Sequence, residues 1–206
     1  MELATILERA AAGQPPPADG GLTFLPRAAG GARAGVVGFT AHHVVAADVD
    51  PDWVRSVLPP GSLSAPMSAR FLAALADRVG AEPGAYDLAL VAPPRAVPLP
   101  ELTPVAVADS ARLRRAERYR VDVRAWTVPG AILVLGRGLA GRWEVSLEVD
   151  PAHRGRGIGR ALVAAAPALV PPGELLWAQV SPANVASVRM FLNAGYRPVA
   201  AEVLLA

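Results

Sequence analysis

Alternation of apolar and polar residues in the second half of the chain predicts a set of strands. Residues 121–128 (VDVRAWTV) and 143–149 (WEVSLEV) alternate with a period of two, and the apolar segment 131–138 lies between them. Pro129-Gly130 and the glycines at 138 and 141 provide turns, so a three-stranded meander is expected. Residues 175–181 and the segment after Gly195 predict two further strands.

Helices are predicted between these strands. The expected helices are residues 107–120, the segment from the glycines near 157 to about 169, and residues 184–195. Asp109 or Ser110 would cap the first of them, whereas Asn184 would cap the last and Gly195 would end it.

The first hundred residues show weaker patterns. Predicted helices are LATILERAAA near the N-terminus, DWVRSVLP (residues 52–59), which Asp50-Pro51 opens, and residues 64–81; predicted strands lie within 34–49 and 86–93. The proline-dense segment 92–104 is expected to connect the two halves.

Composition favours a folded protein. The chain has 206 residues, of which 52% are hydrophobic and 18% charged, and it contains no cysteine. No apolar run reaches the roughly 18 residues of a membrane span, and the acidic N-terminus is unlike a secretory signal. We therefore expect a cytoplasmic protein without membrane contact.

Charge does not indicate a nucleic-acid partner. The net charge is +2, every basic residue counted in it is arginine, and the densest basic run, residues 112–124, has no accompanying aromatic platform. A solvated helix face explains this run better. With three histidines and no cysteine, no metal-ligand spacing appears, and no metal is expected.

The segment VDPAHRGRGIGRAL, residues 149–162, places a glycine turn between a strand and a helix. It is not a dinucleotide fingerprint, because Arg160 occupies the position of the last glycine, and the absence of lysine excludes a Walker loop. Glycine amides at a helix N-terminus, surrounded by arginines, form an anion site that suits a pyrophosphate. The alternative is a solvated surface turn.

Two motifs together resemble the Gcn5-related N-acetyltransferase (GNAT) family. Arg154, Gly157 and Gly159 match its motif A, and NVASVRMFLNAGY, residues 184–196, is similar to its second motif. The resemblance covers roughly residues 107–206. It implies an α/β fold with a mixed, mostly antiparallel sheet flanked by helices.

The resemblance also implies acetyl-CoA as co-substrate. Its pyrophosphate would lie on the amides of residues 154–160, and its pantetheine between strands 143–149 and 175–181, which splay apart. The backbone of Val149 would bind the pantetheine or the thioester carbonyl and stabilise the oxyanion. The expected cofactor contacts are Leu147, Val149, Arg154, Gly155, Arg156, Gly157, Ile158, Gly159, Arg160, Asn184, Ser187 and Phe191.

Glu144 and Glu148 are the candidate general bases. They share one face of strand 143–149, where the family often carries a carboxylate, and a half-buried group with a raised pKa would suit the task. An exposed polar strand face is the alternative. Phe191 stands where the family often has a tyrosine acid, and it has no proton to give.

These features predict an acetyl-CoA-dependent N-acetyltransferase. The amine of an unidentified small molecule or protein would attack directly in a ternary complex. The alternative is a non-catalytic acyl-CoA-binding module. Residues 101–206 would form the core, and residues 21–100 would pack on it and shape the acceptor side. The strand–helix–helix–strand order of residues 21–100 allows a degenerate second copy of the fold. Residues 1–20 would be a tail whose helix docks loosely or is exchanged in a homodimer.

Overall fold

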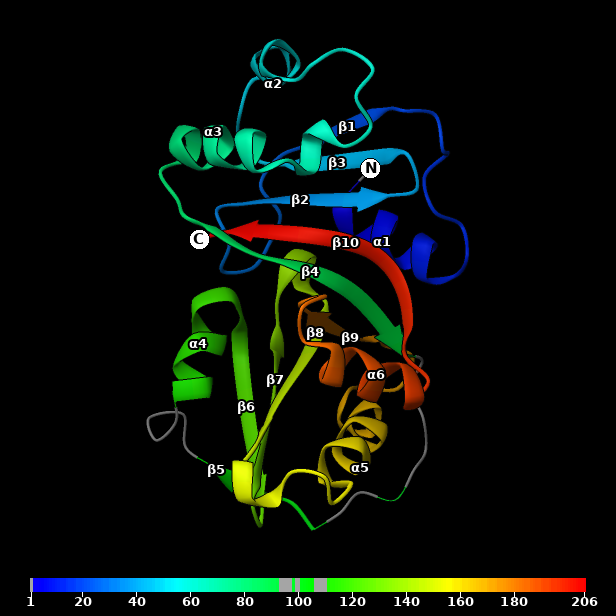
Figure 1. Ribbon diagram of the computed structural model, residues 1–206, viewed down its shortest axis with the longest axis vertical. Helices are drawn as coiled ribbons and strands as arrows, with labels where there is room; N and C mark the ends of the chain where they lie inside the picture. The colour runs from blue at the N-terminus through cyan, green and yellow to red at the C-terminus, as the bar shows by residue number, and fades with distance from the viewer. Residues whose placement is uncertain (1, 93–97, 99–100, 106–110) are drawn as a thin grey trace.

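The computed structural model describes residues 2–92, 98, 101–105 and 111–206, and these build one ten-stranded sheet (Figure 1). The order of the strands is β1-β3-β2-β10-β4-β9-β8-β7-β6-β5. The pairs β1–β3 and β8–β9 are parallel, and the other pairs between neighbouring described strands are antiparallel. The mixed, mostly antiparallel α/β fold expected from the sequence is therefore confirmed.

The strands have the following bounds: β1 Leu22–Leu25, β2 Ala34–Phe39, β3 His42–Ala46, β4 Pro83–Ala92, β5 Thr103–Val105, β6 Val121–Val128, β7 Ala131–Arg137, β8 Trp143–Val149, β9 Leu176–Val180 and β10 Arg197–Leu205. The sequence patterns predicted most of these strands, including the meander β6–β7–β8. They missed β1 and β5, which are only four and three residues long.

The helices have the following bounds: α1 Leu3–Ala11, α2 Pro51–Val57, α3 Ala69–Val79, α4 Ala111–Tyr119, α5 Ile158–Ala165 and α6 Val185–Asn193. Asn184 caps α6 as predicted, since its side chain accepts a hydrogen bond from the Ser187 N–H at 3.1 Å. The caps predicted for α4, Asp109 and Ser110, lie outside the described residues. No helix in the described ranges is long and apolar enough to cross a membrane.

Helices cover both faces of the sheet. The helices α5 and α6 pack with β7, β8 and β9 on one face, and α4 packs on the opposite face of β6 and β7. At the other end, α1 and α3 cover opposite faces of β2 and β3. The apolar face of α1 is buried in its own chain, with Leu7 only 2% exposed, so this helix is part of the core.

Strand β4 joins the first half of the chain to the second. It lies between β9 and β10, with Leu90 opposite Ala178 and Asp87 opposite Glu202 (Figure 1). Ala89 belongs to the core around α1, whereas Leu90 belongs to the core around α5 and α6. Since side chains alternate along a strand, Asp87 shares the face of Ala89, which is also the face on which α4 lies. Whether the halves are separate domains stays a prediction.

Candidate functional site

Two adjoining cavities follow the strand β8. The first, here called the loop groove, is lined by β8, the segment 153–160 and the start of α6. The second, here called the sheet cavity, is lined by α4, β4, β8, β9, α6 and β10. The two cavities share four lining residues, namely Arg112, Leu147, Asn184 and Ser187.

The glycine segment is open toward the loop groove. Gly157 caps α5 with φ = 82°, and a Cβ added there would find no atom within 4 Å. The N–H groups in the first turn of a helix have no intrahelical partner, so those of α5 are available at this point. Gly159 has another role, because a Cβ there would lie 2.8 Å from the Met190 sulfur. The absence of a side chain at Gly159 allows α5 to approach α6.

Strand β8 has a free edge beside these amides. Its pairing with β9 ends at Val145↔Ala178, although β8 continues to Val149, which agrees with the expected splaying of the two strands. The Asp150 N–H donates to the Gly130 carbonyl at 2.9 Å, so the even-numbered residues of β8 form the hydrogen-bonded pairs with β7. The odd-numbered residues of β8 therefore direct their N–H and C=O groups toward β9.

Two arginines hold the carbonyl groups on this edge. Arg112 donates to the Leu147 carbonyl at 2.7 Å, and Arg154 Nε donates to the Val149 carbonyl at 3.0 Å. The N–H groups of Leu147 and Val149 point in the same direction as these carbonyls. The edge thus presents backbone donors to the groove.

The structure brings together ten of the twelve residues expected to contact the cofactor. These ten line the loop groove: Leu147, Val149, Arg154, Gly155, Gly157, Ile158, Gly159, Arg160, Asn184 and Ser187. Arg156 is exposed and does not line it. Phe191 lines the sheet cavity instead, where its ring packs edge-on against Tyr196 with the centroids 4.9 Å apart.

Glu144 does not have the environment expected of a base. It is completely buried, lines neither cavity, and accepts from Arg120 Nε and Arg142 Nε at 2.9 Å each. Burial alone would raise its pKa, but Arg142 and Arg120 together hold the pKa below its ordinary value. The expectation of a half-buried carboxylate with a raised pKa is therefore wrong for Glu144, which is an ion-pair centre inside the fold.

Glu148 is the more accessible of the two candidate bases. Its side chain is 56% exposed, lines the loop groove, and lies 3.6 Å from Arg112 Nε. Its part in catalysis stays a prediction. The Tyr196 hydroxyl could be considered in place of the acid absent at Phe191, but it donates to the buried Val163 carbonyl at 3.2 Å.

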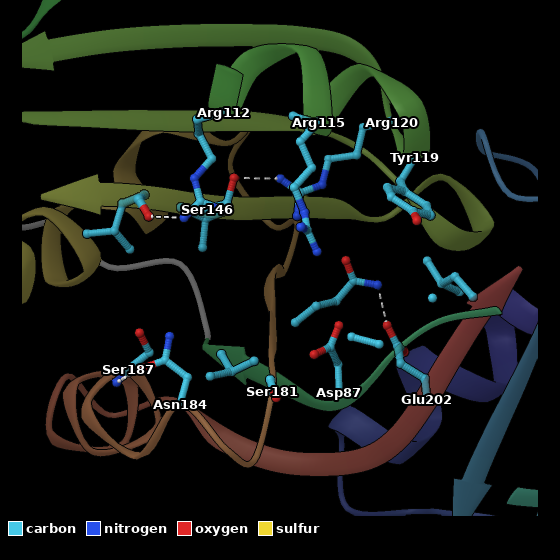
Figure 2. Close-up of a pocket in the computed structure, with 18 of the residues that line it drawn as sticks. Asp87, Arg112, Arg115, Tyr119, Arg120, Ser146, Ser181, Asn184, Ser187 and Glu202 are labelled. Carbon is cyan, nitrogen blue, oxygen red and sulfur yellow. Dashed lines mark hydrogen bonds between the residues drawn. The ribbon is translucent and has the colours of Figure 1, made fainter. Parts of the chain in front are cut away.

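Asp87 is a carboxylate that the sequence analysis missed. It projects from β4 into the sheet cavity (Figure 2). Burial, reinforced by repulsion from Glu202, raises its pKa to about 6. The available signal was a single acidic residue in the otherwise apolar strand YDLALVA, which lies outside both motifs.

Comparison with known proteins finds a family match in the second half of the chain. The model of the acetyltransferase (GNAT) family matches residues 106–196. No curated protein matches the sequence. Among solved structures, a GCN5-related N-acetyltransferase from Kribbella flavida shares 22% identity with a TM-score of 0.42, covering 65% of this chain and 62% of that one.

Two other solved structures are similarly distant. A Drosophila protein shares 16% identity at a TM-score of 0.47, covering 79% of this chain and 60% of that one. An acetyltransferase of the GNAT family from Colwellia psychrerythraea shares 12% identity at a TM-score of 0.41, covering 66% and 62%. The chain thus spans between 60% and 62% of the length of these three structures.

Proposed function

We propose that the protein transfers an acetyl group from acetyl-CoA to a primary amine, because residues 106–196 match the model of the acetyltransferase (GNAT) family. The family supports acyl transfer in general. The observation that carries the finer proposal is the junction of the loop groove with the sheet cavity, because it joins the N-terminus of α5 to a cavity holding a carboxylate of raised pKa. We expect no metal to take part.

Acetyl-CoA would bind along the loop groove. The pyrophosphate would lie on the amides at the start of α5, where the helix dipole and the adjacent Arg154 and Arg160 favour negative charge. The pantetheine would extend along the free edge of β8 toward the residues that both cavities share. Its thioester carbonyl would accept from a backbone N–H at Leu147 or Val149.

The acceptor amine would enter from the sheet cavity. Its nitrogen attacks the thioester carbon, the backbone N–H stabilises the oxyanion, and the C–S bond then breaks to release CoA thiolate. Asp87 receives the amine proton, directly or through a water, because its pKa of about 6 leaves it mostly ionised at neutral pH. We assign the base to Asp87 in preference to Glu144, and the thiolate can take its proton from water.

Homodimer formation and a cytoplasmic location stay predictions.

Binding of acetyl-CoA in the loop groove can be tested by introducing a side chain at Gly157. We expect Gly157→Val to raise the Kd of acetyl-CoA at least about tenfold, because its side chain would occupy the space that a pyrophosphate needs. Calorimetric titration measures the Kd, and thiol release across a panel of amines measures transfer.

Gly173→Val is the matched control for this substitution. Gly173 also has a positive φ, 87°, and open space at its Cβ position, but it lies outside the groove. Both variants therefore carry similar backbone strain. A folded Gly157 variant that binds acetyl-CoA as tightly as the parent would place the site elsewhere. Binding without thiol release for any amine would favour the non-catalytic module.

The arginines around the turn should contribute unequally. Arg154 lines the groove and Arg156 does not, so Arg154→Ala should weaken acetyl-CoA binding by about 1–3 kcal/mol and Arg156→Ala by less. Added salt should weaken the parent more than the Arg154 variant, which has already lost part of the screened attraction. Titrations at two salt concentrations measure this difference. Equal losses at both positions would indicate a diffuse basic patch.

A further inference from the structure

Most charged groups around the sheet cavity already have partners within the protein. Arg142 donates to both oxygens of Glu202, and Gln179 Nε2 donates to Glu202 Oε1 at 2.5 Å. Arg120 is held by Glu144 and by the Ser146 hydroxyl, which accepts at 3.1 Å. These groups are fixed by the fold, and their charges are largely compensated.

Two opposite charges on the cavity walls are different. Arg115 extends from α4, and Asp87 extends from β4 on the facing wall (Figure 2). Within the described part of the chain, neither side chain has a hydrogen bond or an ion pair. They are close enough for the Arg115 charge to act on the carboxylate of Asp87, yet they do not meet.

We propose that the acceptor is a small zwitterion, an amino acid with a free carboxylate, whose ammonium group binds toward Asp87 and whose carboxylate binds Arg115. This inference rests on the proposed acetyltransferase function and names the substrate class for the same site. A guanidinium presents a planar fork of donors that matches a carboxylate. A bridging zwitterion would compensate both charges at once.

The same arrangement orients the acceptor for the reaction. With its carboxylate bound to Arg115 of α4 and its nitrogen beside Asp87 of β4, the acceptor holds its amine next to the proposed base. Asp87 removes one proton from the ammonium group, and the nitrogen lone pair thus freed forms the C–N bond. The C–S bond of acetyl-CoA then breaks, and the second proton lost from the nitrogen passes to the departing thiolate, directly or through water. The product is an N-acetyl amino acid. A diamine or polyamine is disfavoured, because its second ammonium would face Arg115.

The test compares acceptors that differ only in the carboxylate. Thiol release from acetyl-CoA is measured with the twenty standard amino acids and with their C-terminal amides. Converting the carboxylate to an amide lowers the pKa of the α-amine, so a larger fraction of the amide carries a deprotonated amine. Without recognition of the carboxylate, the amide would therefore be the better acceptor. For the preferred acceptor, we expect the acid to exceed the amide in kcat/KM by about 10- to 100-fold, mainly through a lower KM.

Arg115→Gln should remove this preference by raising the KM of the acid far more than that of the amide. Loss of the Arg115 charge also affects the pKa of Asp87, but it does so for both acceptors alike, so the ratio of acid to amide is the readout. Arg114→Gln is the matched control, because Arg114 is an exposed arginine on the same helix that does not line the cavity. The Tm of each variant, compared with that of the parent, separates a loss of carboxylate recognition from a loss of stability.

The outcomes separate this inference from the function on which it rests. Equal or better transfer to amides in the parent, or an Arg115 variant that keeps the preference for the acid, would overturn the zwitterion proposal alone. If acetyl-CoA binds tightly but no thiol is released with any amino acid or amide, the proposed function and this inference both fail.

Discussion

Replacing Glu144 with glutamine is expected to lower the free energy of unfolding by about 3–5 kcal/mol, the cost of removing one partner from a buried ion pair. The substitution keeps the shape of the side chain but removes its charge. Arg120 and Arg142, each less than 10% exposed, would then lose the carboxylate that they share. Urea unfolding measures the change.

The loss should depend on pH in a defined direction. The pKa of Glu144 is lowered in the folded protein, so its ion pairs stabilise the fold above the pKa of the unfolded chain, and this stability is lost as pH falls through the folded pKa. The difference between parent and variant should therefore shrink in acid. Glu148→Gln, at an exposed pair, should cost about 1 kcal/mol or less. A Glu144 variant as stable as the Glu148 variant at neutral pH would contradict this account.

Replacing Asp87 with asparagine is expected to lower kcat/KM by about 10²- to 10⁴-fold, the usual contribution of a general base. In the parent, kcat/KM should fall as pH drops below about 6, because Asp87 then becomes protonated. This limb of the profile should be absent in the variant. Steady-state thiol release between pH 5 and 9 measures both effects.

Stability provides the control for this variant. A raised pKa means that the folded protein disfavours the ionised form of Asp87. The free energy of unfolding therefore falls as pH rises from the pKa of Asp87 in the unfolded chain to about 6, and it stays lower above that pH. Asp87→Asn should therefore be at least as stable as the parent at pH 8, and its loss of rate cannot come from unfolding. If Glu148→Gln instead abolishes the acid limb, the base is Glu148 and our assignment fails.

The sequence alone predicted those features that depend on residues close together in the chain. The glycine turn, the cap at Asn184 and the meander β6–β7–β8 depend on neighbouring residues, because turns, caps and strand periodicity are short-range properties. Two motifs in sequence were therefore enough to indicate the family, the fold and the groove at the start of α5.

The tertiary structure decided the roles of the carboxylates. Glu144 and Glu148 look alike in the sequence, since both point to one face of one strand. Their environments differ because Arg120 and Arg142 enclose the first, whereas the second remains exposed. A pKa depends on burial and on charges brought close by folding, which no spacing along β8 encodes.

The same reason explains why Asp87 and Arg115 could not be found beforehand. Asp87 reaches the site only because β4, from the first half of the chain, pairs between β9 and β10 of the second half. Arg115 faces it from α4 across the sheet cavity, although the sequence showed only one more arginine in a basic run. The sequence by itself determined where a CoA pyrophosphate is expected to bind. The pairing of distant strands decided which side chains surround the acceptor, because strand partners are chosen by packing of the whole sheet.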